Sequence, residues 1–141
     1  MTHASRDTST GLKFEEYITI KSEGICLTKN NLYKYLKDNN IDWTSILSRK
    51  LLPDEAYYNP NTKEFSIYEK KYQQTEGSAD EKPQTCGFKI WEYIKIGYAI
   101  GAEKVTHTYL LSSWFAQDKY RDMLNYIRTE VEDCDYIIVG D

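Results

Sequence analysis

The sequence predicts one α/β domain, built on a central mixed β-sheet flanked by helices on both faces. A chain of 141 residues, 40% of them hydrophobic, suits a single core. The predicted elements run in the order helices, β-hairpin, helix, strand, helix, strand. Because helices separate the later strands, crossover connections and a mixed sheet follow. We expect residues 1–10 to be a flexible, polar N-terminus and 11–141 to form the domain.

The first elements are two helices. Apolar spacing predicts a helix from Gly11 to near Gly24 through Phe14, Tyr17 and Ile18. A second helix is predicted over 30–38, with Thr28 as a candidate N-cap and with inward residues Leu32, Tyr35 and Leu36. Residues 39–50 fit a short helix or a strand equally well.

Strand signals follow at 51–58 and 65–73, with the turn "NPNTKE" between them. After a polar connection, a helix begins between Ser78 and Cys86 and ends at Gly101. Its predicted apolar face consists of Ile90, Trp91, Ile94 and Tyr98.

The last three predicted elements are a strand, a helix and a strand. Residues 104–112 are β-branched and apolar, which predicts a strand. Residues 117–131 predict an amphipathic helix with Tyr120, Leu124 and Ile127 on its apolar face, and 135–140 predict a closing strand.

Composition excludes several classes. No window approaches the roughly 20 apolar residues of a membrane span, and the N-terminus lacks a signal-peptide core, so we expect a cytoplasmic chain with no membrane partner. Three cysteines without C-x-x-C spacing predict reduced, mostly buried thiols. With only two histidines, zinc chemistry is disfavoured, so a metal would be a hard one held by carboxylates. The net charge of −4 argues mildly against a protein that coats nucleic acid, without excluding a local basic rim.

The second predicted strand carries charges into its interior. Side chains alternate along a strand, so one face holds Phe65, Ile67, Glu69, Lys71 and Gln73. The apolar members turn this face inward, and a buried carboxylate needs a cation. Either Lys71 or a metal shared with Asp54, fifteen positions earlier on the preceding strand, supplies it. The purely structural alternatives are a turn or cap acid for Asp54 and a solvated cross-strand ion pair for Glu69 and Lys71.

Two carboxylates and a lysine suit phosphodiester hydrolysis. Mg²⁺ prefers oxygen ligands and usually keeps several waters, so two acids and a phosphate oxygen leave room for a nucleophilic water. The metal lowers the pKa of that water, while an ammonium orients it or stabilises charge on the phosphate. The pattern therefore favours Mg²⁺, with Mn²⁺ as a substitute.

At these residues the chain resembles the PD-(D/E)XK nuclease superfamily, the type II restriction endonuclease fold. Pro53-Asp54 followed by Glu69-Lys70-Lys71 matches its signature, and the predicted order from Leu12 to Ser112 matches its core. The resemblance implies that Asp54 and Glu69 bind the metal and that Lys71 assists hydrolysis. It adds Glu15 in the first helix, with Glu16 as the alternative, and Gln73.

The resemblance implies a deoxyribonuclease that cuts duplex DNA, and cutting both strands favours a homodimer. A junction resolvase, a homing nuclease or a toxin nuclease stays open within the same superfamily. An alternative outside catalysis is an inactive nucleic-acid- or protein-binding module on the same fold. Surface lysines that could meet phosphate are Lys70, Lys82 and Lys89, whereas Trp91, Trp114 and His107 are interpreted as packed residues.

Overall fold

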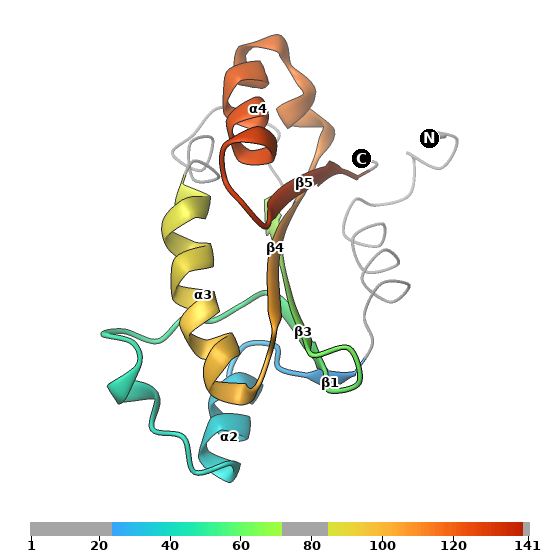
Figure 1. Cartoon of the computed structure of the whole chain (residues 1–141). Coiled ribbons are helices and arrows are strands. Elements are labelled where there is room, and N and C mark those ends of the chain that lie inside the picture. The colour runs from blue at the N-terminus through green and yellow to red at the C-terminus, as the bar shows by residue number, and fades with distance from the viewer. Residues whose placement is uncertain (1–23, 72–84, 140–141) are drawn as a thin grey trace.

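The computed structural model describes residues 24–71 and 85–139 (Figure 1). The predicted helix from Gly11 to near Gly24, apart from Gly24 itself, and the earliest predicted start of the next helix, Ser78, therefore lie outside the described residues. The helices and strands are β1 (Ile25–Cys26), α2 (Asn31–Asp38), η1 (Trp43–Ser45), β2 (Glu55–Asn59), β3 (Glu64–Lys71), α3 (Cys86–Ile100), β4 (Lys104–Leu111), η3 (Ser113–Ala116), η4 (Asp118–Tyr120), α4 (Arg121–Thr129) and β5 (Cys134–Ile138). The η elements are single 3₁₀ turns.

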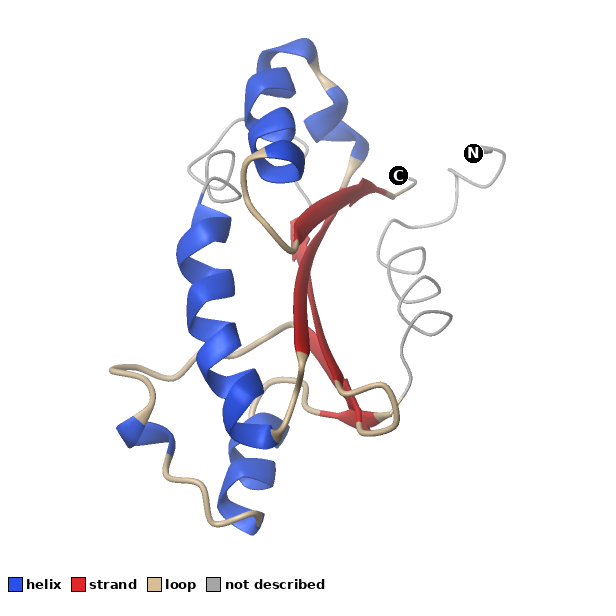
Figure 2. Ribbon diagram, in the orientation of Figure 1, coloured by secondary structure: helices blue, strands red, loops and turns tan. Residues whose placement is uncertain are grey.

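The five described strands form one mixed sheet in the order β1-β2-β3-β4-β5 (Figure 2). β1, β2 and β3 pair antiparallel, whereas β3, β4 and β5 pair parallel. The hairpin between β2 and β3 and the two crossovers through α3 and α4 are the connections that the sequence predicts. The α/β class is thus confirmed.

All three described α-helices lie on one face of the sheet (Figures 1 and 2). Our prediction of helices on both faces is not met within the described residues. The two crossovers advance in the same direction, from β3 to β4 to β5, so crossovers of one hand place α3 and α4 on the same face. Helical cover of the other face stays a prediction.

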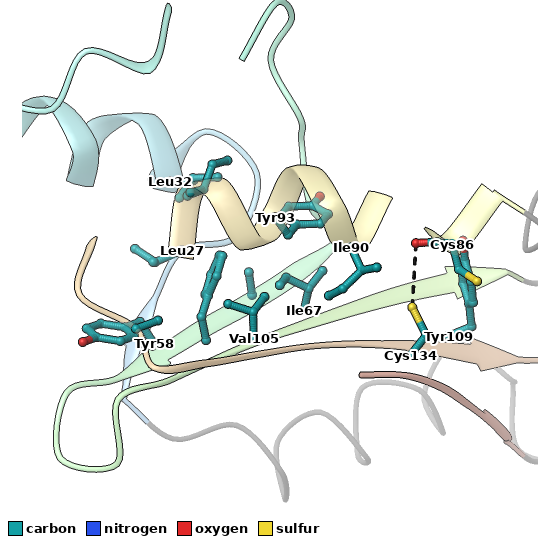
Figure 3. Packing of buried hydrophobic residues seen from close by; sticks show 14 of the residues in the cluster. Leu27, Leu32, Tyr58, Ile67, Cys86, Ile90, Tyr93, Val105, Tyr109 and Cys134 are labelled. Atoms are coloured by element: carbon teal, nitrogen blue, oxygen red, sulfur yellow. Dashed lines mark hydrogen bonds between the residues drawn. The ribbon is translucent and has the colours of Figure 1, made fainter. Parts of the chain in front are cut away.

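α3 packs against the sheet and builds most of the core (Figure 3). Phe65 and Ile67 of β3 are fully buried beneath it, and the Tyr93 ring lies 6.3 Å from the Phe65 ring. Gly97 permits a close approach, because a Cβ atom there would lie 2.4 Å from Val105 Cγ2. The helix ends at Gly101, whose φ of 99° suits glycine, as the sequence predicts.

The predicted apolar face of α3 is wrong in part. Trp91 and Tyr98 are 53% and 65% exposed, whereas the buried residues of this helix are Cys86, Ile90, Glu92, Tyr93, Ile96 and Gly97. The helix carries apolar residues on nearly every side, so its spacing alone does not select the inward face. Trp114 is half-buried and packs against the core.

Other boundaries differ slightly. Thr28 does not cap α2, because Asn30 occupies the N-cap position. The Thr28 hydroxyl instead accepts a hydrogen bond from the Ala56 amide at 3.2 Å. Residues 51–54 precede β2 rather than belonging to it, so Asp54 lies directly before the strand on which it was predicted. On α4 and the turn before it, Tyr120, Leu124 and Ile127 are buried as predicted.

Candidate functional site

Asp54 and Glu69 lie opposite one another on adjacent segments of the sheet. β2 and β3 pair with Glu55 opposite Tyr68, so the next position places Asp54 opposite Glu69. A hydrogen bond supports this register, because the Lys70 amide donates to Asp54 Oδ2 at 3.0 Å. By alternation both acids belong to the face that α3 covers. The hairpin thus brings together the two acids that are separated in sequence.

Glu69 is a buried carboxylate that contacts a lysine and a histidine. It is 7% exposed, and its Oε1 accepts a hydrogen bond from Lys89 Nζ of α3 at 2.8 Å. The same oxygen lies 3.0 Å from Nε2 of His107, a fully buried residue of β4. The sequence predicts that Glu69 needs a cation, and Lys89 supplies one. The two predicted cations, Lys71 and a metal shared with Asp54, stay predictions.

These partners keep Glu69 ionised. Burial raises its pKa, but the hydrogen bond and charge of His107, followed by those of Lys89, outweigh burial and lower the pKa to about 2. The carboxyl group is therefore negatively charged at neutral pH, which a metal ligand or an ion-pair partner requires.

Asp54 is held at the more open side of this cluster. Its Oδ1 accepts a hydrogen bond from Lys29 Nζ at 2.7 Å, and the Asp54 side chain is about a quarter exposed. Because its other oxygen accepts the Lys70 amide, both carboxylate oxygens are oriented. Each still has a lone pair for a further ligand.

The two neighbouring lysines of β3 lie on opposite faces of the sheet. Lys71 is two positions beyond Glu69, so alternation places it on the face of the acids, and it is partly buried. Lys70 lies on the other face, where its Nζ is 3.8 Å from Glu55 Oε2. The structure thus separates Lys71 from Lys70, as the E-x-K spacing predicts.

Two tyrosines and a further acid border the cluster. Burial, followed by the negative charge of Glu69, raises the pKa of both Tyr93 and Tyr109, so their hydroxyls stay protonated. The negative charges of Asp54 and Glu92 also raise the pKa of Tyr93, after burial and Glu69. Glu92 is buried on α3, and sequence reasoning missed it.

Sequence reasoning also missed the role of His107 as a partner of Glu69. It predicted a packed or hydrogen-bonded histidine, which is confirmed, but it did not name the partner. The available signal was alternation along β4, where Val105, His107 and Tyr109 share one inward face. His107 Nδ1 is buried without a hydrogen-bond partner in the described part of the chain.

Several predicted site residues lie outside the described residues. These are Glu15, Glu16, Gln73 and Lys82, so their proposed support of the site stays a prediction. Across 24–71 and 85–139, no group of three or more His, Cys, Asp or Glu side chains is arranged to hold a metal ion. None of the helices in these ranges is long and apolar enough to cross a membrane.

A separate hollow of about 490 Å³ lies beside α2 and η1. Tyr33, Trp43, Lys37 and Lys50 line it, and the Lys50 Nζ sits 4.9 Å from the centre of the Tyr33 ring. Its one acid, Asp42, accepts hydrogen bonds from the Thr44 amide and hydroxyl. The hollow does not include Asp54 or Glu69.

Comparison with known proteins gives no further guide. No family model, no curated protein and no solved structure matches the chain.

Proposed function

We propose that this chain is a divalent-metal-dependent nuclease that hydrolyses DNA phosphodiester bonds. The observation that carries the proposal is the β2–β3 register, which places Asp54, directly before β2, opposite Glu69 of β3, together with the hydrogen bond from the Lys70 amide to Asp54. The strand order gives secondary support, since an antiparallel β-meander, a helix and a parallel strand are the arrangement that the PD-(D/E)XK resemblance implies.

The chemistry of the donor set fits a hard cation. Glu69 is ionised, and its hydrogen bonds to Lys89 and His107 both use Oε1, so within the described residues Oε2 is the candidate ligand atom. Asp54 adds two oriented oxygens. Mg²⁺ typically binds through one or two carboxylates together with water and substrate phosphate, so two protein acids suffice.

Each residue of the cluster has a distinct task in this proposal. Asp54 and Glu69 would hold the ion, which when bound activates water and neutralises phosphate charge. Lys89 and His107 keep the Glu69 carboxylate ionised and fix its orientation. Lys71, on the same face, would place its ammonium beside the attacking water or the phosphate oxygens.

Cleavage by a matched pair of variants tests the proposal. Wild-type protein is incubated with supercoiled plasmid and Mg²⁺ or Mn²⁺, beside Lys71→Ala and Lys70→Ala. Both variants remove one lysine from β3, but only Lys71 shares the face of the acids. We expect Lys71→Ala to lose cleavage by at least about a hundredfold and Lys70→Ala to retain most of it. Equal activity in both variants, or no cleavage of duplex, branched or single-stranded DNA by wild type, contradicts the proposal.

One observation favours a second candidate, a binding module without catalysis. Lysines already neutralise both acids, since Lys29 pairs with Asp54 and Lys89 with Glu69. In this alternative the acids stabilise the fold through ion pairs, a largely buried one at Glu69 and a more exposed one at Asp54, and need no metal. Metal titration separates the two, because only a nuclease requires the acids to bind a divalent ion.

A further inference from the structure

α3 turns an unusual face to solvent. Phe88, Trp91 and Tyr98 are 61%, 53% and 65% exposed, and they recur at positions that bring them onto one side of the helix. The Phe88 and Trp91 rings lie 5.9 Å apart with their planes tilted by 35°. Lys95 stands over Trp91, with Nζ 3.8 Å from the ring centre. We name these four residues the α3 aromatic face.

The charge of this face is opposite in sign to that of the whole chain. The net charge is −4, yet the charged residues of α3 are Lys89, Glu92 and Lys95, and Glu92 is buried. The solvent side of the helix therefore presents aromatic rings and the Lys95 ammonium group with no exposed carboxylate of its own, since the Lys89 ammonium binds Glu69. Stacking surfaces beside cations match the bases and phosphates of a nucleic-acid strand.

Helix α3 links the α3 aromatic face to the candidate site. Lys89 immediately follows Phe88, and its ammonium reaches Glu69 Oε1 at 2.8 Å. One turn of one helix thus carries both a contact to the proposed metal-binding acid and the first exposed ring. The rings lie on the solvent side of this helix, whereas the Lys89 ammonium is directed toward β3.

We propose that the α3 aromatic face binds single-stranded nucleic acid, with successive bases stacked on Phe88 and Trp91 and a phosphate beside Lys95. Duplex bases stack on each other and hide their faces, so the rings select an unpaired or frayed strand. The inference rests on the proposed function, because it names the form of nucleic acid that would reach the proposed nuclease site. Its binding step needs neither metal nor cleavage.

Fluorescence anisotropy of a labelled 15-nucleotide thymidine oligomer, in EDTA, tests this binding directly. We compare wild type with Phe88→Ala, Trp91→Ala and Lys95→Ala. Tyr126→Ala is the matched control, because Tyr126 is also an exposed aromatic residue, 45% exposed, but lies on α4. Circular dichroism and thermal unfolding verify that each variant folds.

We expect Phe88→Ala and Trp91→Ala each to raise the dissociation constant about 5- to 150-fold. Lys95→Ala should raise it by a smaller factor, and that factor should be larger at low salt. The control should bind as wild type does. Unchanged binding in the ring variants overturns the inference, as does the absence of binding by wild type. If the ring deletions instead abolish concentration-dependent self-association, a second copy of the chain occupies this face and the inference is wrong. If wild type binds the oligomer but does not cleave plasmid, the proposed nuclease function is rejected and the binding inference stands.

Discussion

Acid sensitivity of the fold gives a quantitative test of the Glu69 cluster. The pKa of Glu69 falls from 4.5 to about 2 in the folded chain, despite the opposing effect of burial, because of His107 and then Lys89. A carboxyl group with a lowered pKa binds fewer protons in the folded state than in the unfolded state. Its contribution to stability is therefore present above pH 4.5 and is lost as the pH falls towards 2.

The size follows from the shift. A change of 2.5 pKa units corresponds to about 3 kcal/mol of unfolding free energy, of which about 2 kcal/mol is already lost at pH 3. Glu69→Gln removes the titrating group, so the variant should lack this part of the pH dependence. Urea unfolding of both proteins in EDTA, followed by circular dichroism from pH 5 to pH 3, measures the difference between them.

The groups that contact Glu69 are the His107 imidazole and the Lys89 ammonium, and the raised pKa values of Tyr93 and Tyr109 keep both hydroxyls neutral over this range. Glu103→Gln provides the control, since Glu103 is exposed and its ion pair with a lysine is 3.8 Å long. The stability gap between wild type and Glu69→Gln should shrink by about 2 kcal/mol from pH 5 to pH 3, with no such change for the control. A gap that stays constant with pH refutes the reasoning.

Two further predictions concern packing. Gly97→Ala should destabilise the fold by about 1–3 kcal/mol in urea unfolding, because its Cβ would meet Val105. Gly87→Ala, in open space on the same helix, should be neutral or stabilise the fold by up to about 1 kcal/mol. Equal effects of the two substitutions would contradict the close approach of α3 and β4. In the native protein a thiol reagent should modify the exposed Cys26 rapidly and the two buried cysteines only after unfolding, so rapid reaction of all three would show that the core around α3 and β5 opens.

Much of the sheet could be predicted from the sequence. Aromatic and apolar residues on either side of the turn over 60–63 specify the β2–β3 hairpin, and helical spacing between strands specifies the parallel crossovers. β1 was missed because it has two residues, Ile25 and Cys26, and is defined only by its pairing with β2. A strand that short has no periodicity of its own.

The candidate site was predictable only where local spacing decides geometry. Alternation placed Glu69 inward, and the hairpin placed Asp54 beside it. The partners were not predictable in the same way, since Lys29, Lys89 and His107 come from three other segments that only the tertiary fold brings to the acids. Contacts between distant segments leave no mark in local periodicity.

The central claim is that Asp54 and Glu69 together hold a divalent ion. Isothermal titration with Mn²⁺ tests it most directly, using wild type, Asp54→Asn, Glu69→Gln and the control Glu55→Gln, which alters an acid on the opposite face of β2. We predict that each site variant weakens Mn²⁺ binding at least about tenfold, while the control binds as wild type does. Equal Mn²⁺ affinity in all four proteins, or none in wild type at millimolar Mn²⁺, would contradict the claim.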